Sequence, residues 1–151
     1  MNALTRVTTF DVPAVPEVVF PLLCPVREHD WIAGWSCEVI HSESGMAEED
    51  CVFLTSFADA GPMTWVVSRY HPPRVIEFTC FVHGAYVMRL KIVLAAEGDS
   101  TRLEWTRRWL SLGPKGDAWL AAWSEAGYRK RMDDVGDSLR HYLATGHILG
   151  S

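Results

Sequence analysis

The feature that most constrains this sequence is a long stretch, residues 36–112, in which apolar and polar residues alternate with a period of two. Such alternation is typical of half-buried β-strands, because successive side chains of a strand point to opposite faces of the sheet. Turn signals such as Ser44-Gly45 and His83-Gly84 interrupt it. The connections leave no room for crossover helices, so neighbouring strands are expected to be antiparallel. The predicted strands are 37–42, 51–57, 63–71, 75–83, 86–95 and 101–111, and a further strand at 4–12 precedes them.

Helical signals lie on either side of this stretch. Pro16 suits the first turn of a helix, and the apolar residues after it predict a short helix that Pro21 kinks or shortens. A second short helix or turn is expected over 25–31, ending at Gly34. After Gly113-Pro114 the pattern predicts one helix of roughly 25 residues. Its inward stripe consists of Ala121, Tyr128, Met132, Val135, Leu139 and Tyr142, whereas Trp119 and Trp123 fall off this stripe.

A strongly curved sheet that wraps around this helix cannot touch it along its whole length, so we expect a cavity between them. The chain has seven Trp residues, more than a core of this size needs, which favours an aromatic lining. The face of each strand that looks inward is inferred from the alternation alone. On this basis the predicted ligand-binding residues are Trp35, Trp65, Tyr86, Met88, Leu90, Trp105, Arg107, Trp109, Tyr128 and Met132.

Length and composition exclude several classes of protein. With 151 residues, 48% of them hydrophobic, the chain is expected to form a single domain over 1–151 without disulfide or metal staples. Cys24, Cys37, Cys51 and Cys80 form no CxxC pair, which favours reduced thiols. A net charge of −5 disfavours nucleic-acid binding. No apolar stretch of transmembrane length and no signal-peptide pattern is found, so we expect a cytoplasmic protein, for which a homodimer is allowed.

The order of these elements, together with three motifs, resembles the START/birch-allergen-like (SRPBCC) helix-grip superfamily, in particular its polyketide cyclase/dehydrase-like branch. Residues 10–20 (FDVPAVPEVVF) are similar to its opening strand, turn and first helix, residues 31–35 (WIAGW) to its Trp-bearing second helix, and residues 132–139 to its final helix. The resemblance implies an α+β fold. A curved antiparallel sheet of about seven strands would wrap around a long C-terminal helix, with two short helices after the first strand. It implies a pocket but no particular reaction, because the superfamily includes lipid and hormone binders, cyclases, chaperone co-activators and ring-hydroxylase subunits.

Four polar residues are candidates for chemistry in the cavity. Arg107 alternates with two Trp residues, so it would hold a carboxylate or phenolate there, or else only cover those rings at an exposed strand end. Glu125 and Tyr128 of the last helix would reach the same space as a general base and a hydroxyl group, or be a rim Glu and a core Tyr. His83 is either an acid–base group or polar coverage of a turn.

Metal and cofactor sites are not predicted. Glu28-His29-Asp30, with His41 and Glu43, has the chemistry of metal ligands, but no ligand spacing supports a site, and a polar surface at a helix end is favoured. A Gly-rich phosphate loop, a nucleophile elbow and a nucleotide fingerprint are absent from the sequence, so we expect neither a metal nor a cofactor.

Three functions remain open. The first is binding of a small hydrophobic ligand, such as a lipid, an aromatic or a polyketide-like molecule, in the cavity. The second is a cofactor-independent enzyme of the cyclase/dehydratase kind, acting through the four polar candidates. The third is an interaction module like the chaperone co-activators, with Trp119 and Trp123 forming a partner or dimer surface. A filled core would favour the third function, and a cavity of several hundred cubic ångströms would favour the first two.

Overall fold

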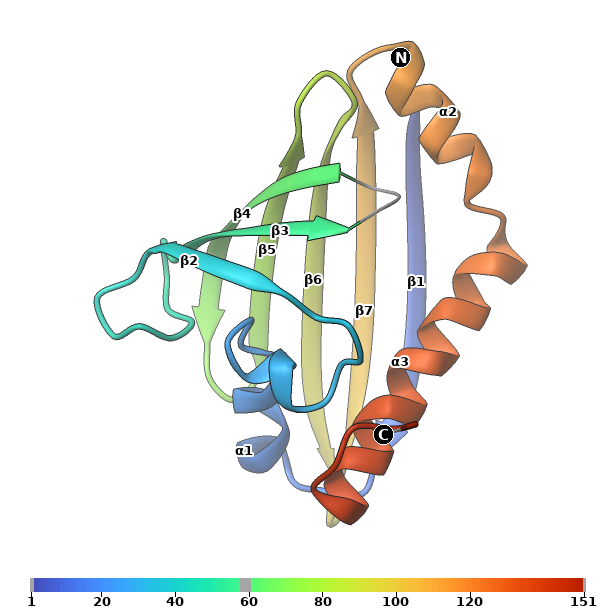
Figure 1. Ribbon diagram of the computed structural model, residues 1–151. Helices are drawn as coiled ribbons and strands as arrows, with labels where there is room; N and C mark the ends of the chain where they lie inside the picture. Colours follow the sequence, from blue (N-terminus) through green and yellow to red (C-terminus); the bar gives the residue numbers. More distant parts are fainter. Residues whose placement is uncertain (1, 58–60, 151) are drawn as a thin grey trace.

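A seven-stranded antiparallel sheet forms the frame of the computed structural model, which describes residues 2–57 and 61–150 (Figure 1). The strand order is β1-β7-β6-β5-β4-β3-β2, so β2 to β7 form the predicted meander and β1 pairs with the last strand. The prediction of a sheet of about seven strands is confirmed. The strands are β1 (Ala3–Val12), β2 (Cys37–His41), β3 (Val52–Phe57), β4 (Gly61–His71), β5 (Val75–Val82), β6 (Tyr86–Glu97) and β7 (Ser100–Ser111).

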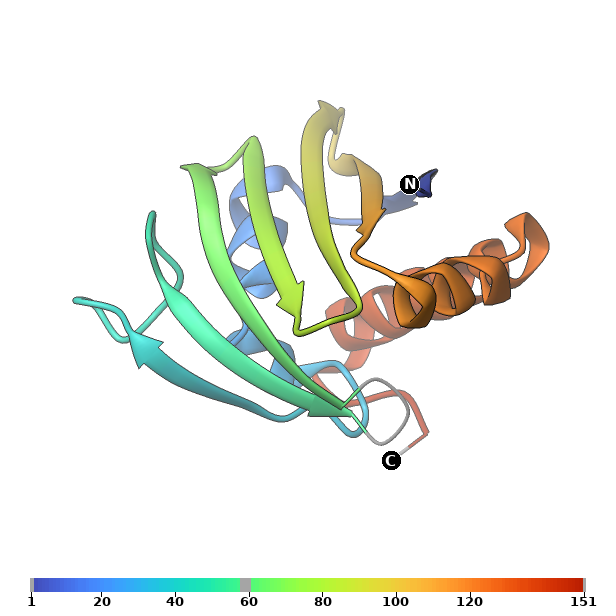
Figure 2. The ribbon, with the colours of Figure 1, turned by 90° about the horizontal axis from the view of Figure 1, so that it is seen from above.

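The register of the sheet decides which side chains share its concave face. Leu90 on β6 lies opposite Arg107 on β7, and Met88 lies opposite Trp109. Directly opposed residues of antiparallel strands project to the same face, so these side chains form one continuous wall. Seen from above, the sheet curls strongly between its two edges, and its hollow side faces the C-terminal helices (Figure 2). The alternation in the sequence therefore becomes an inner face and an outer face.

Short helical turns close one end of the curved sheet. The predicted first helix is divided into α1 (Pro16–Val19) and a 3₁₀-helix, η1 (Phe20–Leu23), because Pro21 cannot continue α-helical hydrogen bonding. A second 3₁₀-helix, η2 (Arg27–Asp30), takes the place of the second predicted helix. Trp31 follows it and is fully buried, and its indole Nε1 donates a hydrogen bond to the Leu22 carbonyl oxygen at 2.7 Å. This bond ties the two 3₁₀-helices together.

The C-terminal helical region differs from the prediction of one continuous helix. It consists of α2 (Pro114–Ala122) and α3 (Glu125–Thr145), separated by the non-helical residues Trp123 and Ser124. Ser124 caps α3, because its side chain accepts a hydrogen bond from the backbone N–H of Gly127. Trp123 has φ −89° and ψ 79°, which ends α2 and changes the direction of the chain.

Helix α3 packs across β1 through the stripe predicted from its spacing. Tyr128, Met132 and Leu139 are buried on this face. Gly136 allows a close approach, since a Cβ atom there would lie 3.2 Å from the Phe10 ring of β1. The other side of the helix is exposed, with ion pairs such as Lys130–Asp134 that contribute little to stability. None of the helices in the described part of the chain has the length and apolarity needed to span a bilayer.

Candidate functional site

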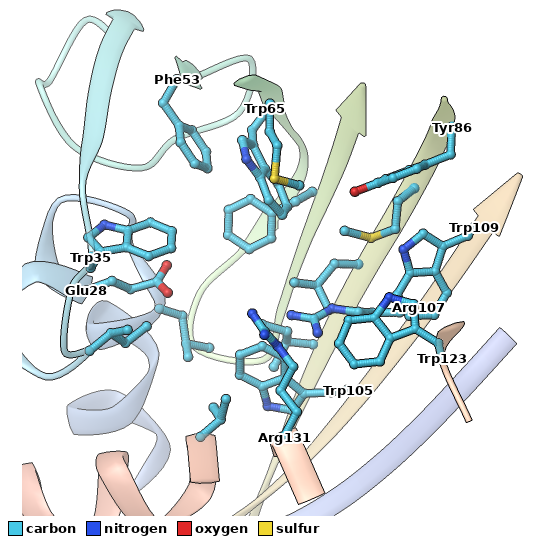
Figure 3. A pocket seen from close by; sticks show the side chains of 18 of the residues that line it. Glu28, Trp35, Phe53, Trp65, Tyr86, Trp105, Arg107, Trp109, Trp123 and Arg131 are labelled. Carbon is cyan, nitrogen blue, oxygen red and sulfur yellow. The ribbon is translucent and has the colours of Figure 1, made fainter. Parts of the chain in front are cut away.

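A cavity of about 350 Å³ lies between the concave face of the sheet and the helices (Figure 3). Six of the seven Trp residues line it, and the exception is Trp31, which is sealed in the short-helix region. Pockets of this size and aromatic content are typical of small-molecule sites. The wall consists of Leu23, Glu28, Ile32, Ala33, Gly34, Trp35, Phe53, Met63, Trp65, Phe78, Tyr86, Met88, Leu90, Ile92, Trp105, Arg107, Trp109, Trp119, Trp123, Arg131 and Val135.

The sheet side of the wall contains most of the residues that were predicted to bind a ligand. These are Trp65 from β4, Tyr86, Met88 and Leu90 from β6, and Trp105, Arg107 and Trp109 from β7, joined by Trp35 from the segment after η2.

Two of these rings are held by hydrogen bonds to other parts of the chain. The Trp35 indole donates to the Pro25 carbonyl oxygen at 2.8 Å. The Trp65 indole donates to the Thr55 hydroxyl at 2.9 Å, and its ring stacks on that of Phe53 with centroids 5.7 Å apart. These partners orient the rings before any ligand enters.

Helix α2 and the residue after it form a part of the cavity wall that was not predicted from the sequence. Trp119 and Trp123 were expected off the inward face, as part of a contact surface, and this prediction is wrong because both line the cavity. Trp119 stacks on Tyr86 at 5.8 Å between ring centroids, and Trp123 stacks on Trp109 at 6.2 Å. The break after α2 causes the difference, since a continuous helix would carry these rings away from the sheet.

Two predicted wall residues lie one layer deeper than expected. Tyr128 and Met132 are buried in the core and do not line the cavity. They pack against Arg107, whose guanidinium carbon lies 5.8 Å from the Tyr128 ring centre and whose Nη1 lies 3.9 Å from the Met132 sulfur. The guanidinium also lies 5.7 Å from the Trp105 ring centre. Both residues therefore support the Arg107 side chain from behind.

The remaining two catalytic candidates lie away from the cavity. His83 is exposed in the hairpin between β5 and β6, and Glu125 is exposed in the first turn of α3. The break between α2 and α3 makes Glu125 the start of a new helix, which points its side chain to solvent. Of the four predicted polar groups, only Arg107 lines the cavity.

The sequence reasoning missed the main acidic residue of the site. Glu28 was assigned to a polar surface with His29 and Asp30, but its side chain lines the cavity while those two are exposed. On a 3₁₀-helix, residues three apart share a face, and Glu28 stands three residues before the buried Trp31. That spacing is the signal that would have placed Glu28 inside.

The charged groups of the cavity face one another across an apolar space. Figure 3 shows the Glu28 carboxylate pointing into the cavity from one wall and the guanidinium groups of Arg107 and Arg131 from the other. Burial raises the pKa of the Glu28 carboxyl well above its usual range, and the charge of Arg107 opposes this rise. Arg131 reaches in from α3 and lies over the Trp123 ring at 5.6 Å.

The described residues form neither a metal-ligand cluster nor a disulfide at the site. Within residues 2–57 and 61–150, no three His, Cys, Asp or Glu side chains come together as a metal-binding group. All four cysteines are free thiols, and three of them are buried. The described wall contributes aromatic rings, the Tyr86 hydroxyl group, two guanidinium groups and one carboxyl group.

A curved antiparallel sheet gripping a C-terminal helix around an apolar cavity defines a protein of the SRPBCC, or helix-grip, superfamily. Within it, the family model described as "polyketide cyclase / dehydrase and lipid transport" matches residues 4–140. The chain belongs to this family, and the resemblance found in its motifs is confirmed. No curated protein matches the chain.

Solved structures share the fold at low sequence identity. DynU16, a protein from the dynemicin biosynthetic locus, is 18% identical with a TM-score of 0.66, over 95% of this chain and 48% of that one. The chain thus spans about half the length of DynU16. Norcoclaurine synthase from Thalictrum flavum, in complex with dopamine and hydroxybenzaldehyde, is 11% identical with a TM-score of 0.67, over 95% and 87% of the two chains. Ara h 8.0201 is 13% identical with a TM-score of 0.68, over 95% and 99%.

Proposed function

We propose that the protein binds a small, largely aromatic ligand in the cavity between the sheet and helices α2 and α3. The observation that carries this proposal is the placement of six of the seven Trp side chains on the wall of one cavity of about 350 Å³. A core built only for stability would fill such a space, because interiors are packed at crystal-like density. Flat rings on several walls favour a ligand that can stack between them.

The comparisons support the same class of ligand. The family includes lipid transport proteins and polyketide cyclases by its description. The norcoclaurine synthase structure holds two aromatic molecules, dopamine and hydroxybenzaldehyde. The interaction-module alternative required a filled interior and outward-facing Trp rings, and neither condition is met by a cavity with Trp119 and Trp123 on its wall.

Ligand binding is tested with the purified protein and a panel of lipids, aromatic acids and polyphenols. Binding is expected to quench Trp fluorescence and to raise the melting temperature, because a ligand that binds only the native state stabilises it. Native mass spectrometry of the freshly purified protein reports any molecule that is retained.

A pair of variants separates the cavity from the outer surface. Met63→Trp places a larger ring on the inner face of β4, so it is expected to weaken binding of compounds that the wild type binds. Thr64→Trp, exposed on the outer face of the same strand, is the matched control and should bind like the wild type. If no compound of the panel binds and no molecule is retained, the proposal fails.

A second function, catalysis of a cyclase/dehydratase type without a cofactor, is favoured by one observation. Glu28 stands across the cavity from Arg107, and its carboxyl group is held toward the neutral form. A neutral carboxyl group can transfer a proton, and a guanidinium group can stabilise an oxyanion that develops opposite it. Conversion of a bound substrate should then fall by orders of magnitude in Glu28→Gln while binding persists. Turnover that is unchanged in Glu28→Gln and Arg107→Gln would refute the assignment.

A further inference from the structure

We infer that the ligand is an acid, a mainly apolar ring-containing molecule whose one carboxylate or ionised phenol or enol oxygen is held by Arg107. The inference rests on the proposed function and adds the charge and the polar chemistry of the ligand. It follows from three properties of the cavity wall. These are the state of Arg107, the relation of Glu28 to Arg107, and the indole N–H groups that have no hydrogen-bond partner among the described residues.

The first property is the state of Arg107. Its guanidinium lies among the Trp105 and Tyr128 rings and the Met132 sulfur, which is a weak acceptor. Its Nε atom is buried with no hydrogen-bond partner among the described residues, and none of their carboxylates forms an ion pair with it. The side chain as a whole is half-buried, and a partly desolvated cation without a carboxylate partner is stabilised when a counter-charge arrives. A bound anion supplies that charge, and the planar guanidinium suits a carboxylate.

The second property is that Glu28 does not pair with Arg107. Glu28 is the one acidic residue among the described residues that line the cavity, against the two cations Arg107 and Arg131. Glu28 makes no hydrogen bond or ion pair with Arg107, and burial holds its carboxyl toward the neutral form. Glu28 therefore offers Arg107 no paired counter-charge from within the described wall. A neutral carboxyl group can in addition donate a hydrogen bond to an anionic oxygen.

The third property is a surplus of hydrogen-bond donors. The indole N–H groups of Trp105 and Trp119 are buried and have no partner in the described part of the chain. They differ from the Trp35 and Trp65 indoles, which donate to protein oxygens. Unsatisfied buried donors in a native structure call for an explanation, and a ligand bearing acceptor oxygens is one. Most of the remaining wall is apolar, so one acidic group on an apolar frame matches it best.

The test compares naphthoic acid with naphthamide. The two molecules have the same rings and nearly the same shape, but only the acid is an anion at neutral pH. Dissociation constants are measured by Trp fluorescence and calorimetry at pH 7. The wild type is expected to bind the acid about tenfold or more tightly than the amide, the ratio expected for one charge-assisted hydrogen bond.

Two variants assign this preference to Arg107. Arg107→Gln should reduce the acid-to-amide ratio to near one. Arg108→Gln is the matched control, because Arg108 is exposed on the opposite face of the same strand, where its Nη1 donates to the Thr5 hydroxyl. It should keep the wild-type ratio. Arg107→Lys retains the charge without the forked donors, and an intermediate ratio is expected.

The outcomes separate the two proposals. Equal binding of acid and amide by the wild type would overturn the acid inference and leave the proposed aromatic-ligand function standing, and this comparison needs no variant to fold. Preference for the acid that persists in Arg107→Gln would overturn the role of Arg107. If neither compound binds and the wider panel also fails, the proposed function falls and the acid inference falls with it.

Discussion

Replacing Glu28 with Gln is expected to stabilise the ligand-free protein at neutral pH, by an amount that grows as the pH rises. Gln has nearly the same shape as a protonated Glu, so the cavity wall keeps its form. The substitution removes the cost of ionising a carboxyl group that burial disfavours. Replacing a polar side chain in a cavity normally destabilises a protein. Glu28→Gln is expected to raise the free energy of unfolding instead, which makes the prediction a demanding one.

The direction follows from the linkage between protonation and folding. The folded-state pKa of Glu28 is raised above the ordinary value of 4.5. Below the unfolded-state pKa the group is neutral in both states, and its contribution to stability is fully present. As the pH rises through the window between the two pKa values, the unfolded chain releases the proton first, so stability is lost. Above the folded-state pKa the loss no longer grows.

The magnitude is set by the slope in that window. One proton of difference between the two states changes the free energy of unfolding by about 1.4 kcal/mol per pH unit. This slope is an upper bound, since Glu28 is only half-buried and its carboxylate faces a cavity that admits water. For a chain of this length the slope corresponds to ~3–6 °C in melting temperature per pH unit.

The assay is thermal and denaturant unfolding of the wild type and Glu28→Gln at intervals from pH 5 to 8. The difference in stability between the two proteins isolates the contribution of Glu28, because the rest of the sequence is the same. The groups that face Glu28 are Arg107 from β7, Arg131 from α3 and the Cys37 thiol from β2. Glu104→Gln, on the exposed outer face of β7, is the control and should show no growing difference. A difference between wild type and Glu28→Gln that stays flat across this range would refute the reasoning.

Three further predictions concern the elements around the cavity. Gly116→Ala should destabilise the protein by about 1–3 kcal/mol, because the added Cβ would lie 1.9 Å from the Ala85 carbonyl oxygen. Gly113→Ala is the control, since its Cβ would meet no atom within 4 Å, and denaturant unfolding compares the two variants. Ser124→Ala should cost about 1 kcal/mol through loss of the α3 cap, and a cost near zero would show that the cap does not hold the junction. Burial raises the pKa of Cys80 to about 12, so iodoacetamide at pH 8 should label this thiol only after unfolding, as followed by peptide mass spectrometry.

The sheet could be predicted from the sequence because its signal is local. Each strand carries its own alternation, and the turns between strands have their own residue types, so strand positions and inner faces follow without knowledge of distant contacts. Leu90, Trp105 and Trp109 lie on the cavity wall for this reason. The depth at which an inward-facing residue lies cannot be predicted from a local pattern in the same way. Tyr128 and Met132 have the right face but lie behind Arg107, and that layering depends on how far α3 stands from the sheet.

The helical parts were harder to predict, and each error has a physical cause. Ser124 is a favourable N-cap residue, but a single Ser does not by itself predict a break in a long helix. The stacking of Trp123 on Trp109, more than a dozen residues earlier in the chain, is a contact that the local sequence does not show. Glu28 stands in a single 3₁₀ turn, which is too short to show a helical period. Both features depend in part on tertiary contacts, and both lie at the cavity.

The junction at Trp123 and Ser124 has a consequence for how this protein can change over evolution or by design. Because α2 ends before α3 begins, the aromatic side of the cavity formed by α2 and the core contacts formed by α3 are encoded in separate stretches of sequence. Substitutions at Trp119 and Trp123 can alter which molecules the cavity accepts while Met132 and Leu139 continue to anchor the fold. Selectivity and stability are thereby partly separated along the chain, and Trp119 and Trp123 are the positions to diversify in a library of ligand-binding variants, while Gly116 and Leu120 are kept because they are buried.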